Sequence, residues 1–149
     1  MVINFLSIKQ VKESSVRYDA LEKKQIRGPK DISNILIDVL DLPSESVEKF
    51  GIINLDVKNR INGIHVLSVG MLSSTIVHPR EVFKAAMMNN ASSIILFHNH
   101  PSGDPTPSNE DIEMTKRIKN AGEIMGISVI DHIIVGDFCF SSLKELGFI

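Results

Sequence analysis

A short apolar run that leads into two histidines and a stiff loop constrains this chain more than any other feature. Ile94–Phe97 are four consecutive apolar residues, which favours a buried strand. His98 and His100 follow directly, and residues 101–107 contain three prolines and a glycine. Because a proline-rich loop loses little conformational entropy on folding, it can return the chain to the strand end at small cost. The sequence therefore predicts a strand, a tight loop and a helix that begins at Ser108.

His98 and His100 are candidate metal ligands. On a strand, residues i and i+2 project from the same side, so we expect both imidazoles to point to one place. Asp111 lies in the first turn of the predicted helix, where its carboxylate can reach the same place. Two histidines and a carboxylate form the open three-ligand pattern of catalytic zinc, with a fourth position for water. Since zinc lowers the pKa of that water toward about 7, the pattern favours hydrolysis.

Each of these residues also has an ordinary structural interpretation. Ser108 and Asp111 fit a helix N-terminus, with a serine cap and an acid in the first turn. A single histidine at position 98 or 100 would more often be a hydrogen-bonded core or loop residue. The two histidines together, at the exit from a buried strand, favour a metal site. We therefore expect Ser108 and Asp111 to cap the helix, and we expect Asp111 also to bind a metal together with the two histidines.

Apolar periodicity predicts the elements around this segment. Helical spacing begins at Asp31, Pro79 and Ser108, and Pro43 is expected to stop the first of these helices. Strands are expected at 2–8, 50–57, 64–69, 94–97, 127–135 and 138–141. Helices that alternate with strands in this order indicate an α/β domain, with a mixed β-sheet flanked by helices.

Length and composition set broad limits. The 149 residues are one domain's worth, and 43% apolar with 23% charged residues is typical of a soluble globular protein. No apolar run approaches the roughly 20 residues that cross a bilayer, and the N-terminus lacks a signal-peptide pattern, so no membrane contact is expected. A single cysteine, Cys139, excludes an internal disulfide and a cysteine-rich zinc site. A reducing, cytoplasmic location is the default expectation.

Charge is distributed unevenly along the chain. The net charge of −2 gives no general attraction to nucleic acid. Residues 1–30, however, carry seven Lys and Arg against three Asp and Glu, whereas residues 31–149 carry nine against fifteen. We therefore divide the chain into a basic N-terminal segment, 1–30, and a metal-binding domain, 31–149. The basic segment can contact phosphate or a partner, although a solvated arm is the simpler interpretation.

Several motifs resemble one known family. His-x-His followed by seven residues, Ser, two residues and Asp resembles the JAMM motif of JAB/MPN-domain metalloproteases. The sequence of residues 99–105, Asn-His-Pro-Ser-Gly-Asp-Pro, resembles the bacterial RadC branch of that family. Further RadC-like sequence motifs lie at 55–59, 78–83 and 131–137, so the resemblance covers about residues 31–149. Full-length RadC proteins usually carry a helix-hairpin-helix region before this domain, and this chain resembles the compact, single-domain members.

The resemblance implies a cytidine-deaminase-like fold and a role for each motif residue. By it, His98, His100 and Asp111 bind zinc, and Ser108 supports the oxyanion. JAMM enzymes also use a glutamate as general acid and base, on an early strand after the first helix. Glu48 stands in the matching place.

Two further positions leave alternatives open. Glu48 also fits an ordinary exposed acid at a strand start, and Glu81 is a rival for the catalytic role, although a helix N-terminus suits Glu81 through the helix dipole. His132 is either a partner behind a ligating histidine or a buried structural histidine paired to Asp131.

The resemblance implies zinc-dependent hydrolysis of an amide, in a peptide or isopeptide bond of a peptide or protein substrate. A DNA-repair-associated accessory protein with a structural or vestigial metal is an alternative, supported by the basic segment and by the label of the RadC branch. A protein-interaction module is a third possibility, against which the complete ligand set argues. The sequence leaves the substrate, the physiological metal, DNA binding and the oligomeric state open.

Overall fold

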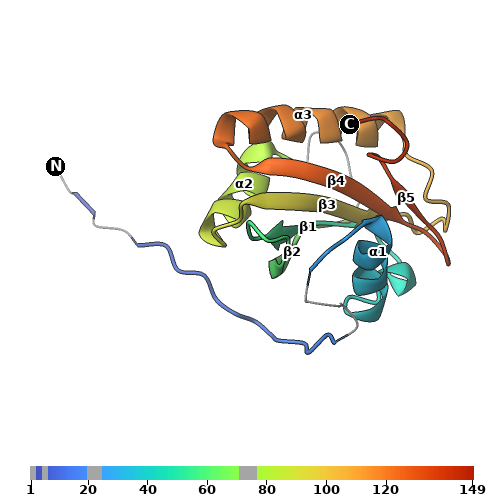
Figure 1. Ribbon diagram of the computed structural model, residues 1–149, viewed down its shortest axis with the longest axis horizontal. Coiled ribbons are helices and arrows are strands. Elements are labelled where there is room, and N and C mark those ends of the chain that lie inside the picture. Colours follow the sequence, from blue (N-terminus) through green and yellow to red (C-terminus); the bar gives the residue numbers. More distant parts are fainter. Residues whose placement is uncertain (1–2, 5–6, 20–24, 71–76) are drawn as a thin grey trace.

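A five-stranded mixed sheet with helices on both faces forms the body of the protein (Figure 1). The computed structural model describes residues 3–4, 7–19, 25–70 and 77–149. The strands are β1 (Lys49–Leu55), β2 (Ile61–Val69), β3 (Ser93–Asn99), β4 (Ser128–Val135) and β5 (Phe140–Ser142). They are arranged in the order β2-β1-β3-β4-β5, and the β3–β4 pair is parallel while the other pairs are antiparallel. The expected α/β class with a mixed sheet is confirmed.

The helices are α1 (Pro29–Asp38), a 3-10 turn η2 (Leu42–Ser44), α2 (Pro79–Met88) and α3 (Asn109–Met125). α1 begins two residues before the expected Asp31, because Pro29 occupies the first turn, where its fixed φ is already helical. It ends at Asp38, so Pro43 lies in η2 and not directly after the helix. α2 and α3 begin at Pro79 and directly after Ser108, as expected.

The β1–β2 hairpin differs from the prediction in both strands, because β1 ends two residues before the expected position 57 and β2 is longer than expected. Its turn is closed by the Asp56 carboxylate, which accepts hydrogen bonds from the backbone N–H groups of Lys58 and Arg60. Pairing therefore starts at once, with Leu55 opposite Ile61, and the second strand begins three residues before the expected position 64. At the other end of the sheet, Phe138 has a φ of 57°, a turn conformation, so β5 begins only at Phe140.

The N-terminal segment shows no regular structure where it is described. The strand expected at 2–8 is absent at residues 3–4 and 7–8, and residues 2, 5 and 6 lie outside the described residues. Residues 7–19 are exposed apart from Tyr18, whose hydroxyl donates to the Asp38 carboxylate at 3.0 Å. Within the described residues, no helix combines the length and the apolar character that a membrane crossing requires.

Apolar side chains cover both faces of the sheet. One cluster lies under α2 and α3 and includes Phe50, Leu96 and Ile118. The other lies under α1 and includes Leu36 and Phe97. Every residue of β3 is buried, as expected for a strand with a continuous apolar sequence. His98 therefore lies in a strand that is packed on both faces, and His100 follows directly after its end.

The register of β3 with its neighbours fixes the positions of His98 and His100. His98 lies opposite Phe50 of β1 and beside Ile134 of β4. Beyond the end of β3, the N–H of His100 donates to the carbonyl of Val135 at 2.9 Å, which continues the pairing by one residue. The carboxyl ends of β3 and β4 and the amino end of β1 consequently meet at one edge of the sheet.

The loop after His100 is fastened to the turn between β4 and β5. The N–H of Gly103 donates to the carbonyl of His100, and the N–H of Asp137 donates to the carbonyl of Gly103, both at 2.9 Å. Gly136 makes this approach possible, since a Cβ atom there would overlap the carbonyl oxygen of Gly103. The absence of a side chain at Gly136 therefore sets the path of the chain just after the histidines.

We predict that Gly136→Ala lowers the free energy of unfolding by about 1–3 kcal/mol, because the methyl group must push the 101–107 loop away from the turn. Urea unfolding of the two proteins measures this difference. Cys139→Ala, which removes an exposed thiol and only its weak 3.7 Å contact with the Gly103 carbonyl, is the control and should change stability by less than about 0.5 kcal/mol. Equal stability of Gly136→Ala and the wild type would contradict the steric argument.

Candidate metal centre

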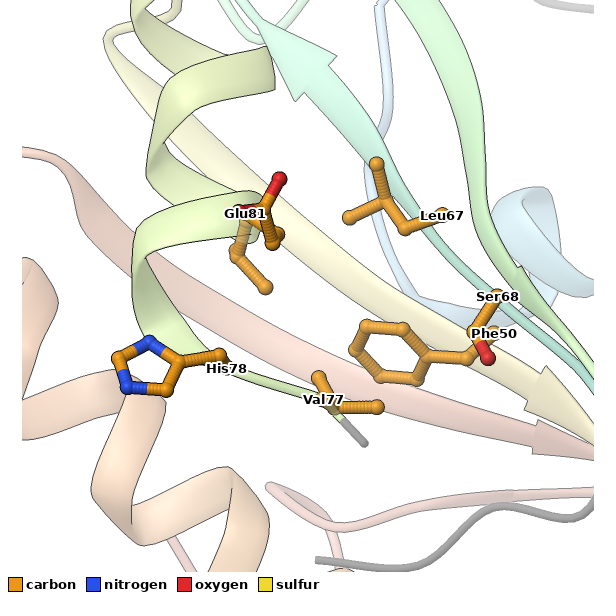
Figure 2. A pocket seen from close by; sticks show the side chains of 7 residues that line it. Phe50, Leu67, Ser68, Val77, His78 and Glu81 are labelled. Carbon is orange, nitrogen blue, oxygen red and sulfur yellow. The ribbon is translucent and has the colours of Figure 1, made fainter. Parts of the chain in front are cut away.

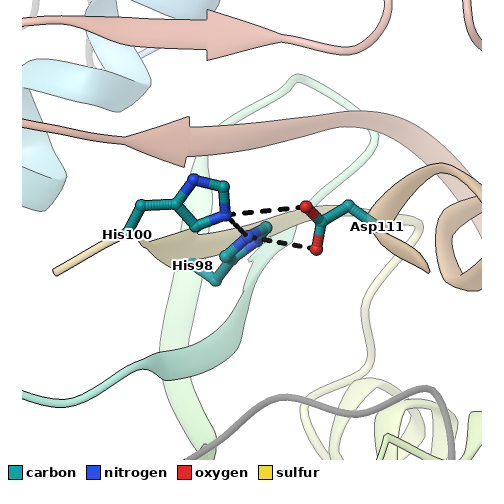
Figure 3. A group of neighbouring side chains, drawn as sticks. All are labelled: His98, His100 and Asp111. Atoms are coloured by element: carbon teal, nitrogen blue, oxygen red, sulfur yellow. Dashed lines mark hydrogen bonds and ion pairs between the residues drawn. The ribbon is translucent and has the colours of Figure 1, made fainter. Parts of the chain in front are cut away.

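Three side chains converge at the sheet edge where β3 ends. The Nε2 atoms of His98 and His100 are 2.9 Å apart. His98 Nε2 lies 3.3 Å from Asp111 Oδ1, and His100 Nε2 lies 3.5 Å from Asp111 Oδ2. Figure 3 shows the two rings, from the end of β3, facing a carboxylate from the first turn of α3. Within the described part of the chain, this is the one group of three His, Cys, Asp or Glu side chains with the spacing of a metal site.

The spacing of these atoms fits a tetrahedral ion. Zinc binds histidine nitrogen and carboxylate oxygen at about 2.0–2.2 Å, so two ligand atoms of a tetrahedral site lie about 3.3 Å apart. The two Nε2 atoms are 2.9 Å apart, and each lies near a different oxygen of the Asp111 carboxylate, His98 at 3.3 Å from Oδ1 and His100 at 3.5 Å from Oδ2, so each of these pairs lies near that value. Two nitrogens and one carboxylate also leave one tetrahedral position for a further ligand. The sequence-based expectation that the three side chains meet is borne out by their positions.

His100 is held by the loop that follows it. Its Nδ1 lies 2.7 Å from the carbonyl oxygen of Asp104. A carbonyl can only accept, so Nδ1 carries the proton, and in the neutral ring Nε2 carries the lone pair that faces His98. The Asp104 carboxylate accepts from the N–H and the hydroxyl of Thr106, which stiffens the turn. The turn role that the sequence favoured for Asp104 is therefore observed.

Asp111 belongs to a capping box at the start of α3. Ser108 Oγ accepts from the N–H of Asp111 at 3.1 Å, while the N–H and hydroxyl of Ser108 donate to Asp111 Oδ2 at 2.8 and 2.7 Å. Asp111 Oδ1 takes no part in the cap and faces His98. The capping interpretation is correct as structure, and the same carboxylate also faces the two histidines.

His132 of β4 lies behind His98. Its Nε2 is 2.8 Å from His98 Nδ1, and its Nδ1 is 2.6 Å from the hydroxyl of Thr115. The Asp131 carboxylate instead accepts from the backbone N–H of His132 and from the hydroxyl of Ser142. The alternative in which Asp131 pairs with the His132 ring is therefore wrong. Thr115, which the sequence did not single out, is the other partner of His132.

The sequence of this chain matches a known protein family. The RadC-like JAB domain family matches residues 26–148. This chain belongs to the RadC-like JAB domain family. Among curated relatives, it is 53% identical over 127 residues to a UPF0758 protein of Caldanaerobacter subterraneus, covering 85% of this chain and 54% of that protein.

Two other relatives agree with this assignment. A UPF0758 protein of Moorella thermoacetica is 50% identical over 125 residues, covering 84% of this chain and 54% of that protein. One of Methanosarcina mazei is 46% identical over 127 residues, covering 85% and 55%. This RadC-like domain thus spans about half the length of the curated relatives that it matches.

Burial and charge set the protonation states in the RadC-like domain. Burial lowers the pKa of His98 to about 4. Burial alone would raise the pKa of Asp111, but the hydrogen bond with His100, the charge of His98 and the bonds from Ser108 outweigh it and lower that pKa. The hydrogen bond to Asp111 raises the pKa of His100, against the effect of burial. Near neutral pH the cluster therefore contains an ionised carboxylate and a neutral His98, the forms that bind metal.

Glu48 lies next to the cluster. It precedes Lys49, the first residue of β1, and lies two residues before Phe50, which pairs with His98. The charge of Glu48 is one of the smaller causes that raise the pKa of His100, after the hydrogen bond to Asp111. This is the position that the family resemblance gave to the glutamate, although its catalytic role stays a prediction.

Glu81 occupies a different place. It lies in the first turn of α2 and lines a cavity of about 70 Å³ that none of the three clustered side chains lines (Figure 2). The other lining residues are Phe50, Leu67, Ser68, Val77, His78 and Val82. The side chain is more than half exposed and pairs with Arg80 at 3.8 Å. Its position thus agrees with the helix-terminus interpretation.

We predict that the metal-free domain loses stability as the pH falls from 6.5 toward 4. His98 has a pKa of about 4 when folded and 6.5 as its ordinary value, so the unfolded chain binds more protons in this range. The shift corresponds to about 3 kcal/mol, which His100, with its raised pKa, offsets in part. Urea unfolding between pH 7 and 4.5 in the presence of a chelator measures the slope.

His98→Gln removes this contribution and should make the pH dependence shallower, while His132, whose pKa burial also lowers, keeps part of the slope. His78→Gln, which changes the residue before α2, is the control and should keep the slope of the wild type. Identical slopes in His98→Gln and the wild type would show that His98 is not held in its neutral form by burial.

Proposed function

We propose that this chain is a zinc-dependent hydrolase that cleaves a peptide or isopeptide bond. The observation that carries the proposal is the approach of two imidazole Nε2 atoms and a carboxylate within 2.9–3.5 Å of one another, at the end of a buried strand. In the neutral His100 ring the proton is on Nδ1, so Nε2 offers a lone pair to this point. A cation between these ligands satisfies all three at once. Membership of the RadC-like JAB domain family supports the same conclusion.

The proposed reaction assigns one task to each residue. His98, His100 and Asp111 would hold a zinc ion at the sheet edge, and the ion would supply an activated water and polarise the substrate carbonyl. Glu48 takes a proton from the attacking water and gives it to the leaving nitrogen, which suits a carboxylate beside His100.

Ser108 is the proposed donor to the oxyanion. Its hydroxyl donates to Asp111 Oδ2 at 2.7 Å in this structure. To serve the oxyanion, the proton must turn from that carboxylate toward the substrate. The Ser108 N–H also donates to Oδ2, so the carboxylate keeps a partner when the hydroxyl turns.

We predict that the wild type binds one zinc ion per chain. Asp111→Asn should lower the zinc affinity by more than about 100-fold, because loss of a ligand costs more than loss of a residue that only hydrogen-bonds to a ligand, which typically costs about 10–100-fold. Elemental analysis after dialysis and competition with a chromophoric chelator measure both quantities. Glu110→Gln changes an exposed acid in the same turn of α3 and should leave zinc binding unchanged. Equal loss in both variants, or no binding by the wild type, would contradict the assignment.

We predict that Glu48→Gln keeps its zinc and cleaves a peptide library at least about 100-fold more slowly than the wild type, because the general base is lost. Glu45→Gln is the matched control. Glu45 lies three residues earlier and pairs with Lys49, and its variant should retain activity. Full activity in Glu48→Gln would move the proton transfer to another group.

A zinc-loaded wild type that cleaves no peptide or isopeptide bond would instead favour the accessory role in DNA repair. In that case DNA binding should fall steeply with salt and disappear when residues 1–24 are deleted. The exposed position of residues 7–19 agrees with such an arm.

A further inference from the structure

A line of buried contacts runs from the candidate metal centre back into α3. His98 Nδ1 lies 2.8 Å from His132 Nε2, and His132 Nδ1 lies 2.6 Å from Thr115 Oγ1. The Thr115 hydroxyl donates to the backbone carbonyl of Asp111, also at 2.6 Å. His98, His132 and Thr115 are completely buried, so water cannot replace any of these contacts. The line joins β3, β4 and α3, and it ends on the residue that supplies the clustered carboxylate.

The carbonyl at the end of this line determines the position of every proton in it. A carbonyl only accepts, so the single hydroxyl proton of Thr115 goes to Asp111. Thr115 Oγ1 must then accept the next bond, which puts a proton on Nδ1 of His132. A neutral His132 has a lone pair on Nε2, which accepts from Nδ1–H of His98. His98 Nε2 is left with its lone pair, and this atom faces His100 and Asp111.

The surroundings of His132 keep this ring neutral. It forms a T-shaped contact with the ring of Phe50, with centroids 6.1 Å apart. The carboxylate of the preceding residue, Asp131, accepts hydrogen bonds from the backbone N–H groups of His132 and Lys144 and from the hydroxyl of Ser142. Both Asp111 carboxylate oxygens point to the other two imidazoles. A charged His132 would therefore be buried with neither ring nitrogen bonded to a carboxylate, which is costly.

We propose that His132 and Thr115 are positioning residues that hold His98 as its Nδ1–H tautomer and thereby set the metal affinity of the site. The proposal rests on the metal site proposed above and does not depend on hydrolysis. His100 reaches the same tautomer by a direct bond to the Asp104 carbonyl. Asp111 has two roles. Its carboxylate faces the metal position, and its backbone carbonyl orients His98 through Thr115 and His132.

The test compares Thr115→Val, which keeps the shape but lacks the hydroxyl, with Thr115→Ser, which keeps the hydroxyl. Zinc affinity of the full chain, from competition with a chromophoric chelator, should fall about 10–100-fold in Thr115→Val and stay within about threefold of the wild type in Thr115→Ser. Equal affinity of folded Thr115→Val and the wild type would overturn the proposal.

A second measurement reads the tautomers without metal. Long-range ¹H–¹⁵N correlation of the imidazole rings should show His98 and His132 protonated on Nδ1 and unprotonated on Nε2 in the wild type, and a mixture of tautomers in Thr115→Val. A wild-type His132 protonated on Nε2 would contradict the proposal.

His132→Gln and His132→Leu give an independent comparison in case Thr115→Val does not fold. Glutamine can accept from His98 through its oxygen and donate to Thr115 through its nitrogen, so it should retain more zinc affinity than leucine. Equal affinities of the glutamine and leucine variants would count against the proposal. Failure of the metal site itself is distinguishable, because the wild type would then bind no zinc, whereas failure of the proposal alone leaves wild-type binding intact.

Discussion

The rest of this site depends on the two interactions of the Asp111 carboxylate, with Ser108 and with His98. One of its oxygens closes the capping box of α3 with Ser108, and the other faces His98 at 3.3 Å. The bond that starts the helix therefore also fixes the third candidate ligand relative to the sheet. Capping boxes are common and by themselves structural. Here the cap stands opposite two histidines at a strand end, and the carboxylate serves both the helix and the cluster.

Burial converts this geometry into chemistry. β3 is buried along its whole length, so its end holds His98 away from water and its pKa at about 4. A neutral imidazole beside an ionised carboxylate is a metal-binding pair near neutral pH. The loop after His100 is tied to the β4–β5 turn through Gly103, and to His100 through the Asp104 carbonyl. The ligands are thus preset by contacts outside the cluster, which limits the entropy that an ion must overcome on binding.

Local patterns predicted part of this arrangement. The convergence of His98 and His100 followed from strand periodicity, and the start of α3 followed from the Ser108 cap. The periodicity argument was incomplete, since β3 ends at Asn99 and His100 is aligned by its bond to Val135. The contact of His98 with His132 spans 34 residues and depends on the parallel register of β3 and β4, which no local pattern encodes. Thr115 was missed because a threonine inside a helix gives no local signal of a partner in the sheet.

X-ray absorption spectroscopy of the zinc-loaded protein tests the central claim most directly. The account predicts two imidazole ligands, with the remaining ligands oxygen, at about 2.0–2.2 Å, and no sulfur at about 2.3 Å. Three imidazoles would mean that a histidine outside the cluster binds the ion, and a thiolate sulfur would mean that Cys139 takes part. Either result would contradict a centre built from His98, His100 and Asp111.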